Sequence, residues 1–485
     1  LLNENQPALG LGTGQQTVSD DGYEWALRGA FFRLNYIYND RYLFEVNGRY
    51  DGTSRFPSDN RFVFLPSFSA AWRISEEPFM QSTRSWLDNL KIRASYGELG
   101  NQMLTASDWS GNTKYYPYIP FISSGTSGNW IFGDEKALYL NPGALVTPDL
   151  TWEKAKTVNV GLDATFFNQR LDFSFDYYQR TTSDMLIKVS YPEVLGTTAP
   201  PSNLAELRTN GWELSLSWKD QIANVGGSPL DYNVGIGISD SYSKITKYDN
   251  PTGYLGDYYE GMELGEIWGY VTDGFIQEIA NHPTQSKIKN TTWKVGDIKY
   301  KNLNGDKEIS NGKNTLEDHG DLTIIGNTTP RYQYGITANL TYKNYYLNIF
   351  MQGVGKRDFW PSGQPFWPAA TEYYNTQKWF LENSWSESNP NAYFARPIAK
   401  DERNRQKQTR YLQDASYLRM KNISLGWNLP KEWIQKVFLS QATVYISAEN
   451  LFEFSKIKGP YDPEAARGNG TMLYPFMRTY SFGVN

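Results

Sequence analysis

Residues 26–51 read A-L-R-G-A-F-F-R-L-N-Y-I-Y-N-D-R-Y-L-F-E-V-N-G-R-Y-D, and this stretch decides the fold. On either side of the polar triplet Asn39-Asp40-Arg41, apolar or aromatic residues alternate with polar ones. Successive side chains of a strand point to opposite faces, so the pattern predicts a hairpin with one apolar-aromatic face and one charged face. Each arm has about ten residues, the length that a tilted strand needs to cross a bilayer.

The same alternation recurs along the chain and brings the total to about 13 strands. Further strands are predicted at 62–73, 90–96, 158–166, 171–177, 212–218, 232–238, 332–340, 345–351, 417–429, 442–450 and 476–485. The connections are short at one end and mostly long at the other, which is typical of periplasmic turns and extracellular loops. The prediction is therefore an all-β, transmembrane antiparallel β-barrel with long extracellular loops and a periplasmic C-terminus.

The predicted strand count is odd, which has a consequence for closure. An odd count leaves an open sheet edge, and lipid does not permit unpaired backbone groups. A closed barrel therefore needs more strands, either before residue 1 or hidden within the longest interruption, residues 243–331. At the end with the short turns, the connections expected after strands 62–73, 212–218 and 417–429 are of intermediate length.

The composition is rich in aromatic residues, with 35 Tyr, 25 Phe and 16 Trp. Tyr and Trp gather at membrane interfaces, where one side of the ring is apolar and the other is wet. A soluble carbohydrate-binding β protein also favours aromatic residues, so composition alone leaves both classes open. There is no apolar run long enough for a transmembrane helix. The first residues, L-L-N-E-N-Q-P, lack the features of a signal peptide, so we expect an exported protein to have lost one.

Charge and reactive residues exclude several classes of function. The net charge is −5 with both signs mixed, which argues against a nucleic-acid partner. The chain has no cysteine, so a thiolate metal site or a cysteine nucleophile is excluded. His282 and His319 are the two histidines, and we expect neither a histidine-based triad nor a histidine-based metal site. We expect no enzymatic activity.

Several segments together resemble the C-terminal barrel portion of SusC/RagA-like TonB-dependent outer-membrane transporters. The matching segments are residues 33–56, 65–79, 90–102, 150–163, 210–218, 417–430 and 448–452. They include L-P-S-F-S-A-A-W-R-I-S-E-E-P-F, L-K-I-R-A-S-Y-G-E-L-G-N-Q and Y-L-R-M-K-N-I-S-L-G-W-N-L-P. Their order and spacing extend over nearly the whole chain.

The resemblance implies features that the alternation does not reveal. It implies a 22-stranded barrel, an N-terminal plug, a segment that contacts TonB, and a SusD-like surface lipoprotein partner. The plug, the TonB-contacting segment and the first strands are expected outside residues 1–485. Residues 1–485 themselves would supply about 13–15 of the 22 strands. The implied function is active import of oligosaccharides or peptides across the outer membrane.

The segment N-L-N-G-D-K-E-I-S, residues 302–310, is a candidate calcium loop. The oxygen-bearing side chains recur at alternating positions, as in known calcium loops, with a backbone carbonyl as a further ligand. The predicted ligands are Asn302, Asn304, Asp306, Glu308 through its carbonyl, and Asp318. Lys307 replaces the glycine that the resembled family often has here, and the alternative is an Asn-Gly surface turn. Calcium is thus the one cofactor considered.

Aromatic residues in two long loops are candidates for contact with the solute or the lid. The segment D-F-W-P-S-G-Q-P-F-W-P, residues 358–368, contributes most of them. The candidates are Phe359, Trp360, Phe366, Trp367 and Trp130. Such rings stack on sugars or peptides, and the alternative is that they pack on one another within the loop.

Two hypotheses of different classes remain from the sequence. The first is the barrel of a TonB-dependent importer with a lipoprotein lid in the outer membrane. The second is a secreted all-β glycan-binding protein that uses its aromatic residues for sugars. Extraction separates them, because a barrel would not partition into buffer without detergent.

Overall fold

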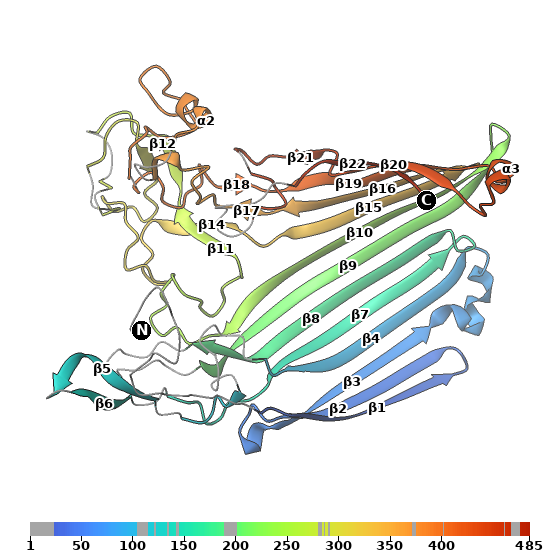
Figure 1. The fold of residues 1–485 in the computed structure, drawn as a ribbon, viewed down its shortest axis with the longest axis horizontal. Coiled ribbons are helices and arrows are strands. Elements are labelled where there is room, and N and C mark those ends of the chain that lie inside the picture. The colour runs from blue at the N-terminus through green and yellow to red at the C-terminus, as the bar shows by residue number, and fades with distance from the viewer. Residues whose placement is uncertain are drawn as a thin grey trace, which may run out of the picture.

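The computed structural model describes residues 24–485 except 104–114, 121–122, 133–134, 142–144, 189–200, 280–283, 286, 290–291, 371–374, 401, 460 and 467–475. Its main feature is a curved antiparallel sheet of 14 strands (Figure 1). Thirteen strands follow one another in chain order, and β21 pairs with β19 beside this path. We call this sheet the wall.

The wall consists of β1 (Leu27–Tyr38), β2 (Tyr42–Thr53), β3 (Phe62–Arg73), β4 (Leu87–Asn101), β7 (Glu153–Phe166), β8 (Leu171–Lys188), β9 (Pro201–Val225), β10 (Ser228–Lys247), β15 (Arg331–Tyr342), β16 (Tyr345–Lys356), β19 (Tyr417–Asn428), β20 (Thr443–Glu449), β21 (Glu453–Ser455) and β22 (Thr479–Val484). Each of the thirteen strands predicted from the alternation corresponds to one strand of this path.

The strand register places the apolar residues on one face of the wall. One cross-strand row runs through Tyr38, Tyr42, Trp72, Ile92, Leu162, Phe175, Leu214, Ile238 and Tyr334. The next row, on the opposite face, runs through Arg93, Gly161, Asp176, Glu213, Ser239 and Gln333. Large apolar side chains of the first face are exposed, for example Leu34 at 66% and Phe482 at 73%. An exposed apolar face of this extent suits lipid, and the polar face suits a lumen.

The two ends of the wall differ in their connections (Figure 1). Tight turns at residues 39–41, 226–227 and 343–344 lie at one end, and Asn485 is hydrogen-bonded to Thr443 at that same end. The long connections gather at the other end (Figure 1). This asymmetry agrees with periplasmic turns and extracellular loops, and with the predicted position of the C-terminus.

The connection between β9 and β10 differs from the prediction. The alternation stops near residue 218 and resumes near 232, which suggested a longer connection. In the structure both strands continue, with Leu230 opposite Ile222, and Gly226-Gly227 form the turn with positive φ angles of 60° and 86°. Pairing to the neighbouring strand supports this extension although its sequence does not alternate cleanly.

Short strands outside the wall form separate two-stranded sheets. These pairs are β5 (Ser123–Phe132) with β6 (Glu135–Asn141), β11 (Glu266–Tyr270) with β14 (Leu322–Asn327), β12 (Thr272–Phe275) with β13 (Ile298–Tyr300), and β17 (Asp358–Phe359) with β18 (Gln413–Asp414). The hypothesis that residues 243–331 hide further barrel strands is therefore wrong, because β11–β14 pair with one another. Within the described residues, β1 and β22 each have one neighbour, so the wall is an open sheet.

Helices are few and short in the described parts of the chain. They are the α-helices α2 (Lys378–Glu382) and α3 (Lys431–Ile434), and the 3-10 helices η2 (Ser58–Asn60), η3 (Ile74–Glu76), η4 (Pro78–Thr83), η6 (Pro368–Ala370) and η7 (Gln435–Val437). None of the described helices is long and apolar enough to span a bilayer.

Aromatic rings gather where the wall meets its short connections. Tyr42 stacks on Trp72 with ring centroids 6.4 Å apart, and Trp86 stacks on Phe166 at 6.0 Å. Further along the wall, Tyr345 stacks on Trp427 at 6.1 Å. Such rings form the girdles that border the apolar band of outer-membrane barrels.

Candidate functional site

The polar face of the wall carries a network of charged side chains centred on Arg93. Its guanidinium donates to the carboxylates of Asp176, at 2.6 Å, and Asp163, at 3.1 Å. Lys91 pairs with Asp163 at 2.8 Å. Gly161 makes the close approach possible, because a Cβ there would lie 2.5 Å from the guanidinium carbon of Arg93. The network links β4, β7 and β8 and neutralises its own charges.

A second group of ion pairs lies on the same face near the first hairpin. Arg33 contacts Glu45 at 2.6 Å, and the Asn47 amide also donates to Glu45 at 2.7 Å. Arg49 pairs with Asp51. These residues belong to the charged face predicted for the hairpin, and the register places them on the polar face of the wall.

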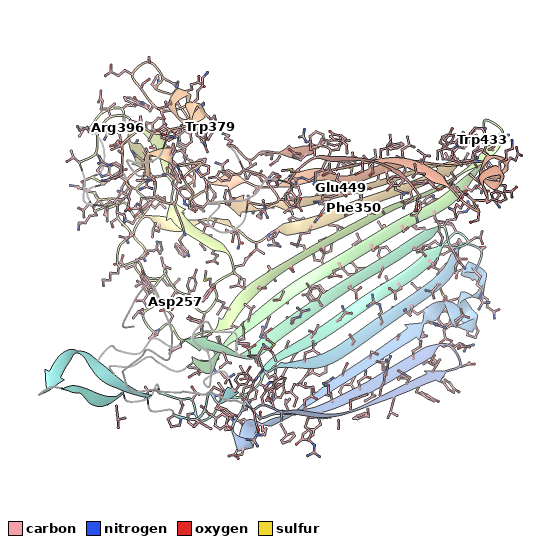
Figure 2. All side chains as sticks on the ribbon, viewed as in Figure 1. Asp257, Phe350, Trp379, Arg396, Trp433 and Glu449 are labelled. Carbon is pink, nitrogen blue, oxygen red and sulfur yellow. The ribbon has the colours of Figure 1, made fainter. Side chains whose placement is uncertain are left out.

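The long loops form a compact unit beyond the wall, which we call the loop head (residues 248–330 and 357–416; Figure 2). Its hydrophobic core takes residues from both loops. The core includes Tyr270, Ile298, Tyr300, Ile309, Phe366, Trp367, Phe380, Phe394 and Tyr411. Backbone hydrogen bonds also join the loops, since Tyr270 donates to Lys407 and accepts from Thr409. The two loops therefore form one packed body.

A buried carboxylate holds the two loops of the head together. Asp297 has no exposed surface, and Arg396 donates to both of its oxygens, at 2.6 and 3.0 Å. Arg403 approaches to 3.6 Å, and the Asn404 amide donates at 3.0 Å. A carboxylate that is buried in this way needs its partners, because an unpaired charge in a protein interior is very costly.

Two tyrosines of the head, Tyr393 and Tyr411, remain protonated near neutral pH. Burial raises the pKa of Tyr393 to about 12, against smaller lowering effects of Gln413 and Arg410. Burial likewise raises the pKa of the Tyr411 hydroxyl, which accepts the backbone N–H of Ala395 at 2.8 Å. Both rings therefore serve as neutral packing and hydrogen-bonding groups.

The predicted aromatic contact residues belong mostly to the interior of the head. Phe366 has no exposed surface, while Phe359 and Trp367 are 2% and 6% exposed. Neighbouring side chains cover these three rings, so they pack within the loops, which was the alternative in the sequence analysis. The prediction that these three rings contact the solute or the lid is corrected accordingly. Trp360 is half-buried against the same core and stays a prediction. The side chain of Trp130, in β5, lies outside the described residues.

The candidate calcium loop folds as a tight turn that uses its own side chains. The side-chain oxygens of Asn302, Asn304 and Asp306 accept the backbone N–H groups of Gly305, Asp306 and Glu308. These are Asx-type bonds, the behaviour expected of an Asn-Gly turn.

The remaining predicted calcium ligands do not complete a cage. The Glu308 carboxylate pairs with Lys287 at 3.2 Å. Asp318 lies in the following loop, where its carboxylate packs against Gly312. Among the described residues, no group of three or more His, Cys, Asp or Glu could hold a metal ion. Calcium takes six to eight oxygen ligands, so the fit is poor, and the site stays a prediction.

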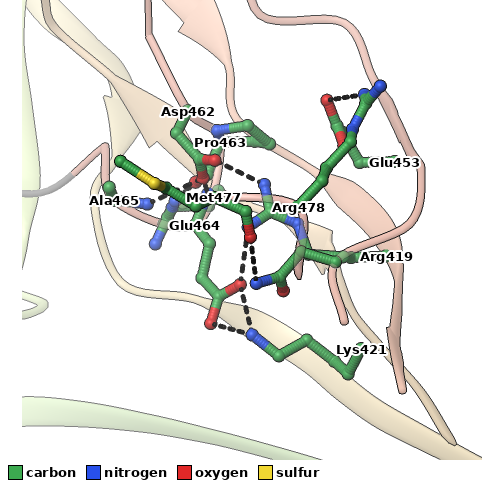
Figure 3. A network of polar contacts seen from close by, with 11 residues as sticks. Arg419, Lys421, Glu453, Asp462, Pro463, Glu464, Ala465, Met477 and Arg478 are labelled. Atoms are coloured by element: carbon green, nitrogen blue, oxygen red, sulfur yellow. Dashed lines mark hydrogen bonds and ion pairs between the residues drawn. The ribbon is translucent and has the colours of Figure 1, made fainter. Parts of the chain in front are cut away.

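A buried charge network that sequence reasoning missed lies at β19 (Figure 3). Arg419 is 1% exposed and contacts Asp462 at 2.6 Å and Glu464 at 3.2 Å. Lys421 pairs with Glu464 at 3.1 Å, and Arg357 donates to the carbonyl of Pro463. The network fastens the 461–466 segment against β19.

A β-bulge lies within this network. Phe350 faces Asn422 whereas Met351 faces Met420, so Lys421 is the extra residue in β19. A bulge redirects the side chains around it. Arg419 and Lys421, two residues apart in β19, reach the same carboxylate, which lies more than forty residues away in the sequence.

Comparison with known proteins decides what this wall belongs to. The family model described as "TonB dependent receptor-like, beta-barrel" matches residues 3–451. The chain belongs to this family. This barrel chain is SusC/RagA-like and forms part of an outer-membrane β-barrel, as predicted. The secreted glycan-binding alternative is thereby set aside, and the family is one of transporters rather than enzymes, as also predicted.

Individual relatives align with nearly the whole of this chain. TonB-dependent receptor P3 of Formosa agariphila is 29% identical and aligns with 97% of this chain and 47% of its own length. TonB-dependent receptor SusC of Bacteroides thetaiotaomicron is 28% identical, over 94% of this chain and 43% of its own. The structure of the RagAB peptide transporter has a TM-score of 0.74 at 24% identity, covering 99% of this chain and 50% of that one. The chain thus spans about half the length of the relatives that it matches.

Proposed function

We propose that the chain forms the C-terminal part of the barrel of a TonB-dependent importer for oligosaccharides or peptides. The observation that carries this proposal is a wall with a polar inner face and a large, packed loop head at one end. The remaining strands, the plug and the TonB-contacting segment would come from outside residues 1–485. TonB would act on the plug, and the solute would cross along the polar face.

The electrostatics of the wall favour a solute of low net charge. On the polar face, cations and carboxylates stand in pairs, such as Arg33 with Glu45 and Arg93 with Asp176. Ion-selective pores instead present rings of one charge. Hydroxyl and amide side chains fill the positions between the pairs, for example Ser95 and Asn159 in one row. Neutral sugars or peptides with mixed charge suit such a surface.

The loop head supports a partner that closes the barrel from outside. Its two loops are fastened to each other through Asp297, so the head presents one joined surface rather than two separate loops. We propose a SusD-like lipoprotein as the lid on this surface. The RagAB structure, named as a peptide transporter, supports the idea of such a pair and of peptides as one solute class.

The test is purification of the intact protein from native outer membranes without adding solute. We expect a surface lipoprotein to copurify, and mass spectrometry to identify a bound oligosaccharide or peptide. Calorimetry with neutral oligosaccharides and with peptides would then assign the class. Recovery without a lipoprotein and without binding of either class would refute the proposal.

A further inference from the structure

The connection between β19 and β20 exposes large apolar side chains at the short-turn end of the wall. It contains α3 and η7, and Figure 2 labels Trp433 there. Trp433, Phe438 and Leu439 are 57%, 98% and 50% exposed, whereas Ile434 is 4% exposed. Among the described side chains of the segment, Ile434 is thus buried while a group of large apolar side chains is exposed. Such a group on a short helical segment marks a surface that something else covers.

The backbone conformation at Phe438 is a second indication that something covers these side chains. Phe438 follows η7 and has φ +62°, the left-handed conformation that closes the turn. Glycine or asparagine is usual at such a position, because a side chain with a Cβ is strained there at some cost in free energy. Within the described structure the ring has almost no contact that would offset this cost. An apolar medium around the ring would supply the missing contact.

The exposed group continues the lipid face of the wall. The Trp433 ring meets Trp427 edge-on, with centroids 5.8 Å apart, and Trp427 stacks on Tyr345. Trp427 pairs with Val444, which pairs with the exposed Val484 of β22. The connection therefore begins where the apolar band ends, at the level of the aromatic girdle.

The charges of the connection suit an anionic surface. Lys431 and Lys436 are exposed, and among the described residues neither has a carboxylate within ion-pair distance. Glu432 is the acid between them, so Lys431 and Lys436 against Glu432 leave a net charge of +1. Aromatic and aliphatic side chains beside lysines are the composition of segments that lie in the lipid headgroup layer.

A second connection at the same end has a related composition. Between β3 and β4, Phe79 is 65% and Trp86 is 46% exposed. Trp86 stacks on Phe166 of the lipid face, and the nearby Arg84 pairs with Glu76 at 3.1 Å. Two connections that lie far apart in the sequence thus place exposed aromatic rings at the same border.

We propose that residues 431–439 lie in the headgroup layer of the inner leaflet, with Trp433, Phe438 and Leu439 inserted and Lys431 and Lys436 on lipid phosphates. The segment is an anchor of the periplasmic rim in the membrane, and its occupant is phospholipid. The inference rests on the barrel position of the chain and is independent of which solute is transported.

The absence of cysteine from this chain allows a direct test. The intact protein, in a cysteine-free background, is labelled with a nitroxide at Phe438→Cys and reconstituted into vesicles of phosphatidylethanolamine and phosphatidylglycerol. Ile446→Cys, on the lipid face, and Ser388→Cys, exposed in the loop head, are the matched references. Spin relaxation by oxygen and by a water-soluble nickel chelate reports the depth of each label.

The expected result is that the label at Phe438 is less accessible to the nickel chelate than the label at Ser388 and reports a depth between those of the labels at Ser388 and Ile446. Accessibility equal to that of the label at Ser388 would overturn the proposal and indicate a periplasmic surface. In a second measurement, the depth of the label at Phe438 is compared in vesicles with and without phosphatidylglycerol. The label should lie deeper when phosphatidylglycerol is present, and Lys431→Gln with Lys436→Gln should abolish this dependence. A dependence that survives these changes would overturn the role assigned to the lysines. Neither measurement involves transport, so failure here is distinct from failure of the proposed importer function.

Discussion

Replacing Ala94 by arginine tests which face of the wall meets lipid. Ala94 is the middle residue of β4, and the register places it between Ala70 and Val160 on the apolar face. It is small and exposed, so the substitution removes no packing and leaves no cavity. Its effect should come from the new charge alone.

The magnitude follows from the depth of the position. The apolar band of an outer-membrane barrel is about 25 Å tall, and the centre of a long tilted strand lies near its midplane. An arginine on the lipid face at that depth costs about 2–4 kcal/mol. Since each 1.4 kcal/mol is about tenfold, the folding equilibrium should fall by a factor of about 30 to 700.

The matched control is Ser95→Arg, one residue further along the same strand. Ser95 is also small and exposed, but it points to the polar face, between Ser69 and Asn159. An arginine there stays in the polar lumen and should cost well under half as much as Ala94→Arg. Urea titration of the intact barrel in lipid vesicles, followed by tryptophan fluorescence, compares the two variants. Equal costs, or a larger cost for Ser95→Arg, would refute the assigned orientation of the faces.

Three further perturbations test other parts of the structure. Asp297→Asn should destabilise the loop head by about 3 kcal/mol, because it leaves two partly buried arginines without their carboxylate; hydrogen exchange should then rise in residues 266–327 and stay unchanged in the wall, and unaltered protection would count against the role of this carboxylate. The pKa of Glu77 is lowered by hydrogen bonds that its carboxylate accepts, mainly from Tyr42 and to a smaller extent from Trp72. The stability contributed by Glu77 should therefore be complete above the ordinary glutamate pKa and be lost as pH falls through the lower folded value; exchange in residues 74–86 measured from neutral pH down to about pH 3 should show this, while Glu77→Gln should remove the pH dependence. If residues 302–310 bind calcium, a chelator should lower the melting temperature of the intact protein and Asp306→Asn should abolish that shift, whereas an unchanged melting curve would support the Asn-Gly turn.

Alternation predicted the wall well because every wall strand meets two different environments along its whole length. A residue such as Val160 contacts lipid wherever its strand sits in the order, so a local pattern is enough to assign its face. Strand ends were less certain: β9 continues to Val225 through a segment without clean alternation, because pairing with β10 supports it.

The sites were harder to predict because their contacts join distant segments. Phe366 looked available for binding in its aromatic loop, and only the packing of both loops shows that it is buried. The partners of Arg419, Asp462 and Glu464, lie in a distant segment that no local pattern joins to β19. The oxygen spacing at Asn302–Asn304–Asp306 gave the turn correctly, but the same spacing serves backbone bonds as readily as a cation.

The shared core of the loop head has a consequence for redesign and for divergence among relatives. Asp297 belongs to the loop between β10 and β15, while Arg396 and Arg403 belong to the loop between β16 and β19. If one of these loops were exchanged for that of another transporter, the buried carboxylate or its arginines would lose their ion-pair partners. Changes of specificity in this head should therefore require both loops to be exchanged together, as a single cassette.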